Sequence, residues 1–383
     1  MKPLFLSAAV AAASLSLISS VAMAGGMDRS GQDTSIILKG GNVMEFLHVS
    51  VAPTVTGTWS GVVSPYTAYN GVASGDVTPD YTMTTMAAKF AATDSIDVAI
   101  INDNPFGADV DWSTGTFSAN GGTNGHVESN ATTLLASYAL EGGVSVYGGV
   151  KNQSLKMNAA VGPLGYSATG ANSNGTGYVL GAAIQNPEIA LKVALTYHAK
   201  VKHTIAMTET SALGTATSNA TFYTPSSINF DFQTGVAENT LLFGSIRTAN
   251  WTETDVAPNM YSAVTLAGLG ASKSLLSYDE NTTTYNVGLG RRFNETWSGA
   301  VTYGYEAAGA GMGDAFSPTN GNNKIGMGVT YTAGDLSATL AVQQVNMGDQ
   351  TAVAAASGST IVSSAAMSNN TGLVTALKIS TKF

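Results

Sequence analysis

Apolar and polar side chains alternate with a period of two along much of this sequence, and this alternation limits the folds available to the chain. The last run, 371–383, shows it most clearly: Leu377, Ile379 and Phe383 share one parity, and Lys378 lies on the other. Because successive side chains of a β-strand point to opposite faces, this run predicts a strand with one apolar and one polar face. A soluble sandwich and a membrane-spanning barrel both use such strands.

Fourteen strand-like runs follow one another from residue 43 to the end of the chain. They lie at 43–56, 81–91, 96–111, 127–140, 144–158, 177–185, 189–205, 227–236, 240–251, 281–291, 297–305, 323–332, 336–346 and 371–383. Most hold the ~9–11 residues that a tilted strand needs to cross a hydrocarbon layer. Aromatic residues gather near the ends of the runs, as in the two girdles of a membrane barrel.

The connections between these runs alternate in length. Six are short and contain turn-forming residues: 92–95, 141–143, 186–188, 237–239, 292–296 and 332–335. Seven are long and rich in Gly, Ser, Thr and Asn: 57–80, 112–126, 159–176, 206–226, 252–280, 306–322 and 347–370. A sandwich with crossover connections would not keep this alternation. The pattern therefore predicts an all-β fold: a transmembrane, antiparallel, up-and-down β-barrel of 14 strands, with short periplasmic turns and long extracellular loops.

Composition agrees with a membrane barrel and excludes other classes. Charged residues make up 11% of the chain, against ~25% in soluble domains. The net charge of −9 argues against nucleic acid as a partner. The chain has no cysteine, so no disulfide framework can hold it together.

The N-terminal region divides into two parts before the barrel begins. Residues 1–24 have a positive start, an apolar stretch and a small-residue cleavage site, which predicts a signal peptide removed after Ala24. Residues 25–42 are polar and without period, and we expect them to form a short N-terminal plug, or hatch. The barrel itself is expected over 43–383, in the outer membrane of a Gram-negative bacterium.

The third run breaks the alternation at Asn102, Asp103, Asn104, Pro105, Phe106 and Gly107. Asn102 and Asn104 fall on the lipid-facing parity, where they are tolerable only if the wall turns inward or opens onto a cavity. Pro105 cannot donate to the ladder, and apolar facing is expected to resume at Phe106 without a change of parity. These residues predict a kink that leaves a lateral gap in the wall. The alternative is a simple turn that divides the run into two shorter strands.

Four segments carry a family resemblance: 102–109 (NDNPFGAD), 187–191 (PEIAL), 230–235 (FDFQTG) and 291–297 (RRFNETW). Together they resemble the FadL-type outer-membrane transporters of long-chain fatty acids and hydrocarbons. The resemblance implies a fourteen-stranded barrel with an N-terminal hatch, a kinked third strand and passive uptake of hydrophobic ligands through a lateral opening. The N-terminal segment is short and has no Asn-Pro-Ala motif of the kind usual in that family.

Candidate ligand contacts are cations that parity places inside the barrel, because a fatty-acid carboxylate favours a cation in a partly dry lumen. They are Lys89, Lys192, Lys200 and Arg247, with Lys192 and Arg247 nearest mid-strand. Each could equally pair with a neighbouring carboxylate. No enzyme motif is present, and His198 and His203 have opposite parity on one run, which argues against a metal pair. We expect no enzyme activity, no cofactor and no metal.

Three functions are compatible with these features. The first is passive uptake of hydrophobic compounds; the others are a general porin for small polar solutes and a surface adhesin or receptor. The expected partners are a hydrophobic small molecule, outer-membrane lipid and lipopolysaccharide, and the barrel-insertion machinery. The C-terminal Phe383 resembles the aromatic residue that this machinery recognises. We expect the chain to act as a monomer.

Overall fold

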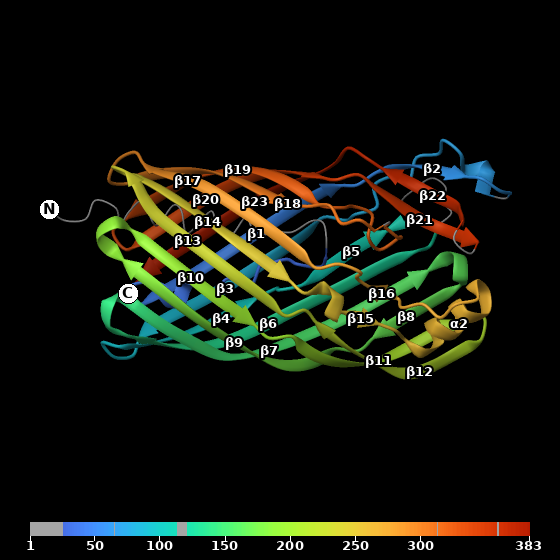
Figure 1. Cartoon of the computed structure of the whole chain (residues 1–383), viewed down its shortest axis with the longest axis horizontal. Helices are drawn as coiled ribbons and strands as arrows, with labels where there is room; N and C mark the ends of the chain where they lie inside the picture. The colour runs from blue at the N-terminus through green and yellow to red at the C-terminus, as the bar shows by residue number, and fades with distance from the viewer. Residues whose placement is uncertain (1–25, 65, 113–120, 312, 358–359) are drawn as a thin grey trace.

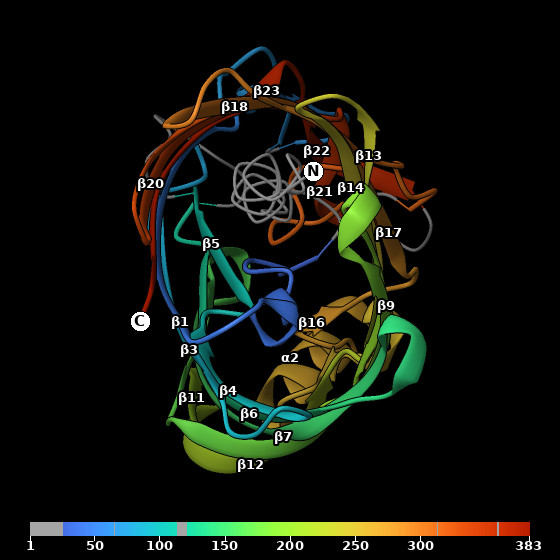
Figure 2. The same ribbon diagram turned by 90° about the vertical axis from the view of Figure 1, so that its left-hand side faces the viewer.

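The structure is a computed structural model that describes residues 26–64, 66–112, 121–311, 313–357 and 360–383. The predicted signal peptide lies outside these residues. Within them, 14 antiparallel strands close into a barrel, which confirms the predicted fold class. Figure 1 shows the barrel from the side, and Figure 2 shows the ring of strands nearly end-on.

The wall strands match the predicted runs closely. They are β1 (Val43–Thr54), β3 (Tyr81–Ala91), β4 (Ile96–Asp103) continued by β5 (Gly107–Asp111), β6 (Asn124–Ala139), β7 (Val144–Val161), β9 (Ser173–Asn186), β10 (Leu191–His198), β13 (Ser227–Ala237), β14 (Thr240–Ala249), β17 (Thr282–Arg292), β18 (Trp297–Glu306), β19 (Asn322–Ala333), β20 (Leu336–Met347) and β23 (Asn370–Lys382). The barrel closes where β1 pairs with β23 on one side and β3 on the other.

Several loops extend beyond the barrel on the side of the long connections (Figure 1). One extension contains β8 (Tyr166–Gly170), β11 (Val201–Ser211) and β12 (Gly214–Thr224), and another contains β2 (Gly57–Gly61), β21 (Gln350–Ser357) and β22 (Thr360–Met367). The loop after β14 carries β15 (Asp255–Val256), α2 (Asn259–Leu269) and β16 (Leu276–Ser277). None of the helices in the described residues is long and apolar enough to cross a membrane.

The two faces of the wall differ as the alternation predicts. On β17 and β18 the outer face exposes Val287, Leu289 and Val301, whereas Asn286 and Thr302 point inward and are buried. An apolar outer band around a polar interior is the arrangement of a transmembrane barrel. Because a closed ring leaves no unpaired edge strand, its backbone groups can lie in hydrocarbon.

The N-terminal segment, residues 26–42, lies inside the barrel (dark blue in Figure 2). It contains a short 3-10 helix, Ser35–Leu38, whose Ile36 and Ile37 are buried with Ala99 and Leu135 of the wall. We call residues 26–42 the plug. Its position inside the ring brings it against the interrupted third strand of the wall.

Candidate functional site

The third wall strand is interrupted between β4 and β5, and both pieces pair with β6. Asp103, the last residue of β4, faces Ala131, and Gly107, the first residue of β5, faces Glu128. Three residues of this strand therefore lie opposite two of β6. An extra residue on one strand is a β-bulge, which bends a strand without ending it. The alternative of a simple turn is therefore not what the structure has, since both pieces remain in one wall strand.

The bulge reverses which side chains face inward, so the prediction that Phe106 continues the lipid-facing series is wrong. Asp103, just before the bulge, points inward. After the bulge, Phe106 and Val110 are the buried residues that face inward. The Phe106 ring is only 1% exposed and packs edge-to-face on Trp251, with 5.5 Å between ring centroids. Because facing changes at every residue of a strand, one extra residue exchanges the two faces.

The two asparagines that interrupt the lipid face are held by hydrogen bonds along the outer wall. Asn102 Nδ2 donates to Asn130 Oδ1 at 2.9 Å and to Thr132 Oγ1 at 3.1 Å. Asn104 Nδ2 donates to the Ser129 carbonyl at 3.1 Å. These bonds to β6 reduce the cost of placing amides in a wall that otherwise faces lipid.

In the part of the chain that the structure describes, β3 and β5 form no backbone pairs. Pairing between β3 and β4 ends at Met86 and Asn102. Farther along, the Asp111 N–H donates to the Val77 carbonyl at 2.8 Å. Between these points the edge of β3 at 81–85 pairs only with β1, over about 16 Å of strand. We call this stretch the wall gap.

Backbone of the plug enters the wall gap and pairs with the bulge. Arg29 N–H donates to the Pro105 carbonyl at 2.9 Å, and Gly107 N–H donates to the Met27 carbonyl at 2.8 Å. Asp28 and Phe106 form an antiparallel bridge between these bonds. The plug thus provides the backbone partner that β3 does not, and movement of the plug would leave this edge of the bulge unpaired, with its other edge still bonded to β6.

The Arg29 side chain continues this contact across the gap. Its Nε donates to the Gly107 carbonyl at 2.9 Å, and its Nη2 lies 3.2 Å from Asp109 Oδ2. The guanidinium carbon lies 3.2 Å from the centroid of the Tyr81 ring of β3. Asn104 Oδ1 also accepts a bond from the Thr84 N–H of β3 at 3.2 Å. Side chains, rather than backbone ladder bonds, therefore connect the two sides of the gap.

Two cavities meet at Arg29. The upper cavity, of about 530 Å³, is lined by Gly26, Met27 and Arg29 of the plug, by Gly107–Val110 of β5 and by residues of the long connections after β1, β14, β18 and β20. The lower cavity, of about 40 Å³, is lined by Ile36, Leu47, Met83, Ile101 and other residues of the plug and wall. Arg29 lines both, so its side chain stands between them.

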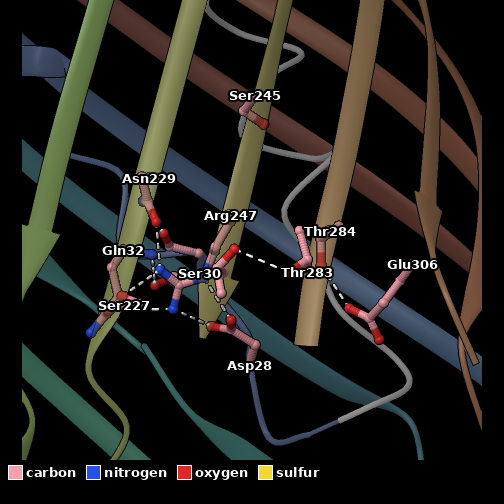
Figure 3. A network of polar contacts seen from close by, with 12 residues as sticks. Asp28, Ser30, Gln32, Ser227, Asn229, Ser245, Arg247, Thr283, Thr284 and Glu306 are labelled. Carbon is pink, nitrogen blue, oxygen red and sulfur yellow. Dashed lines mark hydrogen bonds and ion pairs between the residues drawn. The ribbon is translucent and has the colours of Figure 1, made fainter. Parts of the chain in front are cut away.

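Arg247, predicted to contact ligand, lies inside the barrel as expected but is fully engaged by the plug and wall (Figure 3). Its Nε and Nη2 lie 2.7 and 3.1 Å from the two carboxylate oxygens of Asp28. Nη1 donates to Ser227 Oγ at 2.8 Å and to Asn229 Oδ1 at 2.7 Å, and Nη2 also reaches Gln32 Oε1 at 3.3 Å. The side chain anchors the plug.

Lys89 and Lys192 are also inside the barrel wall but line neither cavity. Lys89 is buried, donates to the Lys39 carbonyl at 2.7 Å and pairs with Asp97 at 2.7 Å, so it too fixes the plug. Lys192 is partly buried on β10 between Gln185 of β9 and Gln233 of β13.

Lys200, the fourth predicted cation, does not point into the lumen. Its side chain is 46% exposed, pairs with Glu253 at 3.3 Å and lies over the Tyr223 ring at 4.9 Å. A break in the strand between His198 and Val201 exchanges the two faces, as at the bulge. For the same reason His203 is buried like His198, although parity on one continuous strand placed them on opposite faces.

Sequence reasoning missed Asp28 and Arg29, the plug residues that make most of these contacts. A signal was available, since two adjacent opposite charges stand out in a polar, aperiodic segment of a chain with few charges. At the other end of the chain, the predicted assembly residue Phe383 is exposed and packs edge-to-face on Phe90, with ring centroids 5.6 Å apart. Its role in assembly stays a prediction.

Comparison with solved structures identifies the architecture. A Pseudomonas aeruginosa FadL homologue superposes with a TM-score of 0.73, at 13% identity, over 96% of this chain and 98% of that one. The fold is that of the FadL-type channels. The P. putida toluene transporter TodX gives a TM-score of 0.62 at 13% identity over 90% and 91% of the two chains. The CymD monoaromatic hydrocarbon channel gives 0.57 at 10% identity over 96% and 97%.

No protein-family model and no curated protein matches the sequence. The likeness to FadL-type channels therefore lies in the fold, and the chain differs from them in most of its residues. A closed barrel with an apolar outer band is an outer-membrane architecture, and the chain is accordingly an outer-membrane protein.

Proposed function

We propose that this chain carries hydrophobic compounds passively across the outer membrane, through the upper cavity and sideways out of the barrel at the wall gap. The observation that carries the proposal is that the upper cavity and the wall gap border the same stretch of the third wall strand. Residues Gly107–Val110 of β5, directly after the bulge, line the cavity, and this part of the strand borders the edge of β3 that lacks a backbone partner. A molecule in the cavity thus lies next to the one wall interruption described above.

The surroundings of the gap suit an exit into lipid. Next to the gap on the periplasmic side, the outer faces of β3 and β4 expose Met86, Phe90, Val98 and Ile100. An apolar solute that leaves the gap would meet this lipid-facing surface without crossing bulk water. Such a step would be favourable by roughly 25 cal/mol for each Å² of apolar surface removed from water.

The plug argues against the general porin. Asp28 and Arg247 join the plug to the wall across the lumen, and Ile36 and Ile37 pack on the opposite side. A porin for polar solutes keeps an open aqueous channel, whereas here the plug lies across the lumen and the cavity between it and the wall holds only about 40 Å³. The FadL homologue, TodX and CymD share the fold, and the names of TodX and CymD describe toluene or monoaromatic hydrocarbon passage.

A liposome assay distinguishes the two functions. Proteoliposomes should take up toluene or an alkane faster than empty liposomes, yet swell little in isotonic sugars. Rapid swelling in sugars without hydrocarbon transfer would sink the uptake proposal. In a second arm, replacing Asn104 and Pro105 by Val and Thr should extend the ladder and slow the transfer.

A further inference from the structure

The upper cavity carries more negative than positive charge. Among the described residues that line it, the acids are Asp109, Asp279, Glu280 and Asp314, and the only base is Arg29. Arg29 is already paired with Asp109, which also contacts His126 Nδ1. Three acids therefore remain without a basic partner in the lining, and Asp279 and Glu280 are exposed to solvent.

Tyr278 and Asp314 also line the cavity, and their ionisation and exposure affect the number of negative charges there. Burial, and then the nearby Asp314 carboxylate, raise the pKa of the Tyr278 hydroxyl, so this tyrosine is neutral. Asp314 is exposed to solvent like Asp279 and Glu280, and its Oδ1 accepts a hydrogen bond from the Phe316 N–H at 2.8 Å. We therefore assign the field of the cavity to these three exposed carboxylates, of which Asp279 and Glu280 are adjacent in the chain.

No predicted cation offsets these acids. Arg247 and Lys89 are engaged with the plug, Lys192 lies outside both cavities, and Lys200 lies on the outer surface. At the floor of the cavity, buried Nη1 of Arg29 has no hydrogen-bond partner. The two N–H donors of this nitrogen can serve a neutral hydroxyl or carbonyl group as well as a carboxylate, so they do not by themselves select an anion.

The rest of the lining is uncharged and partly aromatic. The rings of Tyr81, Tyr278 and Phe316 border the cavity together with Met27 and Val110. Aromatic faces attract cations, and the effect is greatest where the cation is desolvated. Apolar side chains would hold the tail of an amphiphile regardless of its head group.

Resting on the proposed uptake function, we propose that the upper cavity discriminates by head-group charge: for equal tails, cationic amphiphiles enter most readily, neutral ones next and carboxylates least. The cargo class is thus neutral or cationic, and fatty-acid anions are disfavoured. Two solvated carboxylates at about 8 Å change binding by roughly 3- to 10-fold at low salt, an effect that ionic strength reduces.

The experiment compares three molecules with the same tail: dodecyltrimethylammonium, dodecanol and dodecanoate. Each displaces a neutral fluorescent probe from the full processed barrel in lipid nanodiscs, with empty nanodiscs subtracted. At low salt and pH 7.5 we expect dodecanoate to bind about 3-fold or more weakly than dodecanol, and the cation to bind most tightly. High salt should reduce the differences among the three affinities.

Variants assign the effect to this cavity. Asp279→Asn with Glu280→Gln should bring the three affinities together; the Gln retains an oxygen to accept the 3.1 Å bond from the Ala310 N–H. The matched control is Glu238→Gln with Asp335→Asn, which removes the same charge from exposed periplasmic turns and should leave the series unchanged.

The following results would overturn the proposal. One is dodecanoate binding as tightly as dodecanol, especially if Arg29→Gln abolishes that binding. Another is a difference among the three affinities that the Asp279 and Glu280 substitutions do not change. If none of the three molecules displaces the probe, the uptake function fails together with this inference. Binding of all three with equal affinity would defeat this inference but leave the uptake function standing.

Discussion

Two arginine–carboxylate contacts hold the plug in the barrel, and they differ in strength. Arg247 reaches both oxygens of Asp28, at 2.7 and 3.1 Å, and adds wall contacts that leave all three of its nitrogens bonded. Arg29 reaches one oxygen of Asp109 at 3.2 Å, and its Nη1 has no partner. One contact lies against an intact wall of β13, β14 and β17, and the other lies in the wall gap.

This difference indicates a division of roles. A bidentate, fully satisfied arginine pair in a dry site is costly to break, because either partner left alone is a buried unpaired charge. The Arg29–Asp109 ion pair is cheaper to break, because it lies beside two cavities where water can replace it. We therefore interpret Arg247–Asp28 as a permanent anchor and Arg29–Asp109 as a latch that can open while the plug stays attached.

Removing the anchor should have the largest effect. Asp28→Ala leaves the Arg247 guanidinium buried and unpaired, and should destabilise the seated plug by about 3–5 kcal/mol. The barrel should still form, since its ladder does not depend on the plug. Limited proteolysis should then cut within 26–42 and release the plug. A plug as resistant as in the parent protein would show that the anchor is elsewhere.

Crowding the plug near the latch should have a smaller effect. Gly26 has a φ of +145°, and a Cβ there would lie 2.4 Å from the Trp251 ring. Gly26→Ala should cost about 1–3 kcal/mol of plug stability and expose the plug amides to hydrogen exchange. Gly40→Ala is the matched control, because nothing lies within 4 Å of its added Cβ. Equal exchange in both variants would contradict a close fit at Gly26.

Releasing the latch should change transport more than stability. Arg29→Gln removes the ion pair with Asp109 and the contact with Tyr81, each worth about 1 kcal/mol, and joins the two cavities. We expect faster hydrocarbon transfer into proteoliposomes with an intact plug. Arg29→Lys keeps the charge and should be intermediate. Slower transfer in Arg29→Gln would mean that Arg29 guides the cargo instead of blocking it.

The smallest effect is expected at Lys200, which contacts neither the plug nor the wall gap. Its pair with Glu253 is solvent-exposed, so Lys200→Ala should change stability by less than about 1 kcal/mol and leave transfer unaltered. Thermal unfolding and the liposome assay measure the two quantities. A marked loss of transfer would restore Lys200 as a ligand contact.

The strands of the wall could be predicted from sequence because each follows a local period of two. The 81–91 run coincides with β3, and most other ends fall within a few residues of the observed ones. The facing of individual residues could be predicted only up to the first irregularity. One extra residue at 104–106 and another break after His198 reversed the inferred faces of Phe106 and Lys200.

The candidate site was harder to predict, because its central residues belong to a segment without period. Asp28 and Arg29 are placed by backbone pairing with Pro105 and Gly107, about 80 residues away in the chain, which no local pattern encodes. Arg247 was correctly placed inside the barrel, yet parity could not reveal that Asp28 occupies it. Contacts between the plug and the wall are properties of the tertiary structure.

A reversible crosslink across the wall gap tests the central claim most directly, since the chain has no cysteine of its own. Thr84→Cys with Asn104→Cys places thiols where the Asn104 side chain already reaches the Thr84 backbone. Ala88→Cys with Ile100→Cys, in the paired part of β3 and β4, is the control. We predict that oxidation stops hydrocarbon transfer in the first variant only, and that reduction restores it. Undiminished transfer through the oxidised gap would contradict lateral exit.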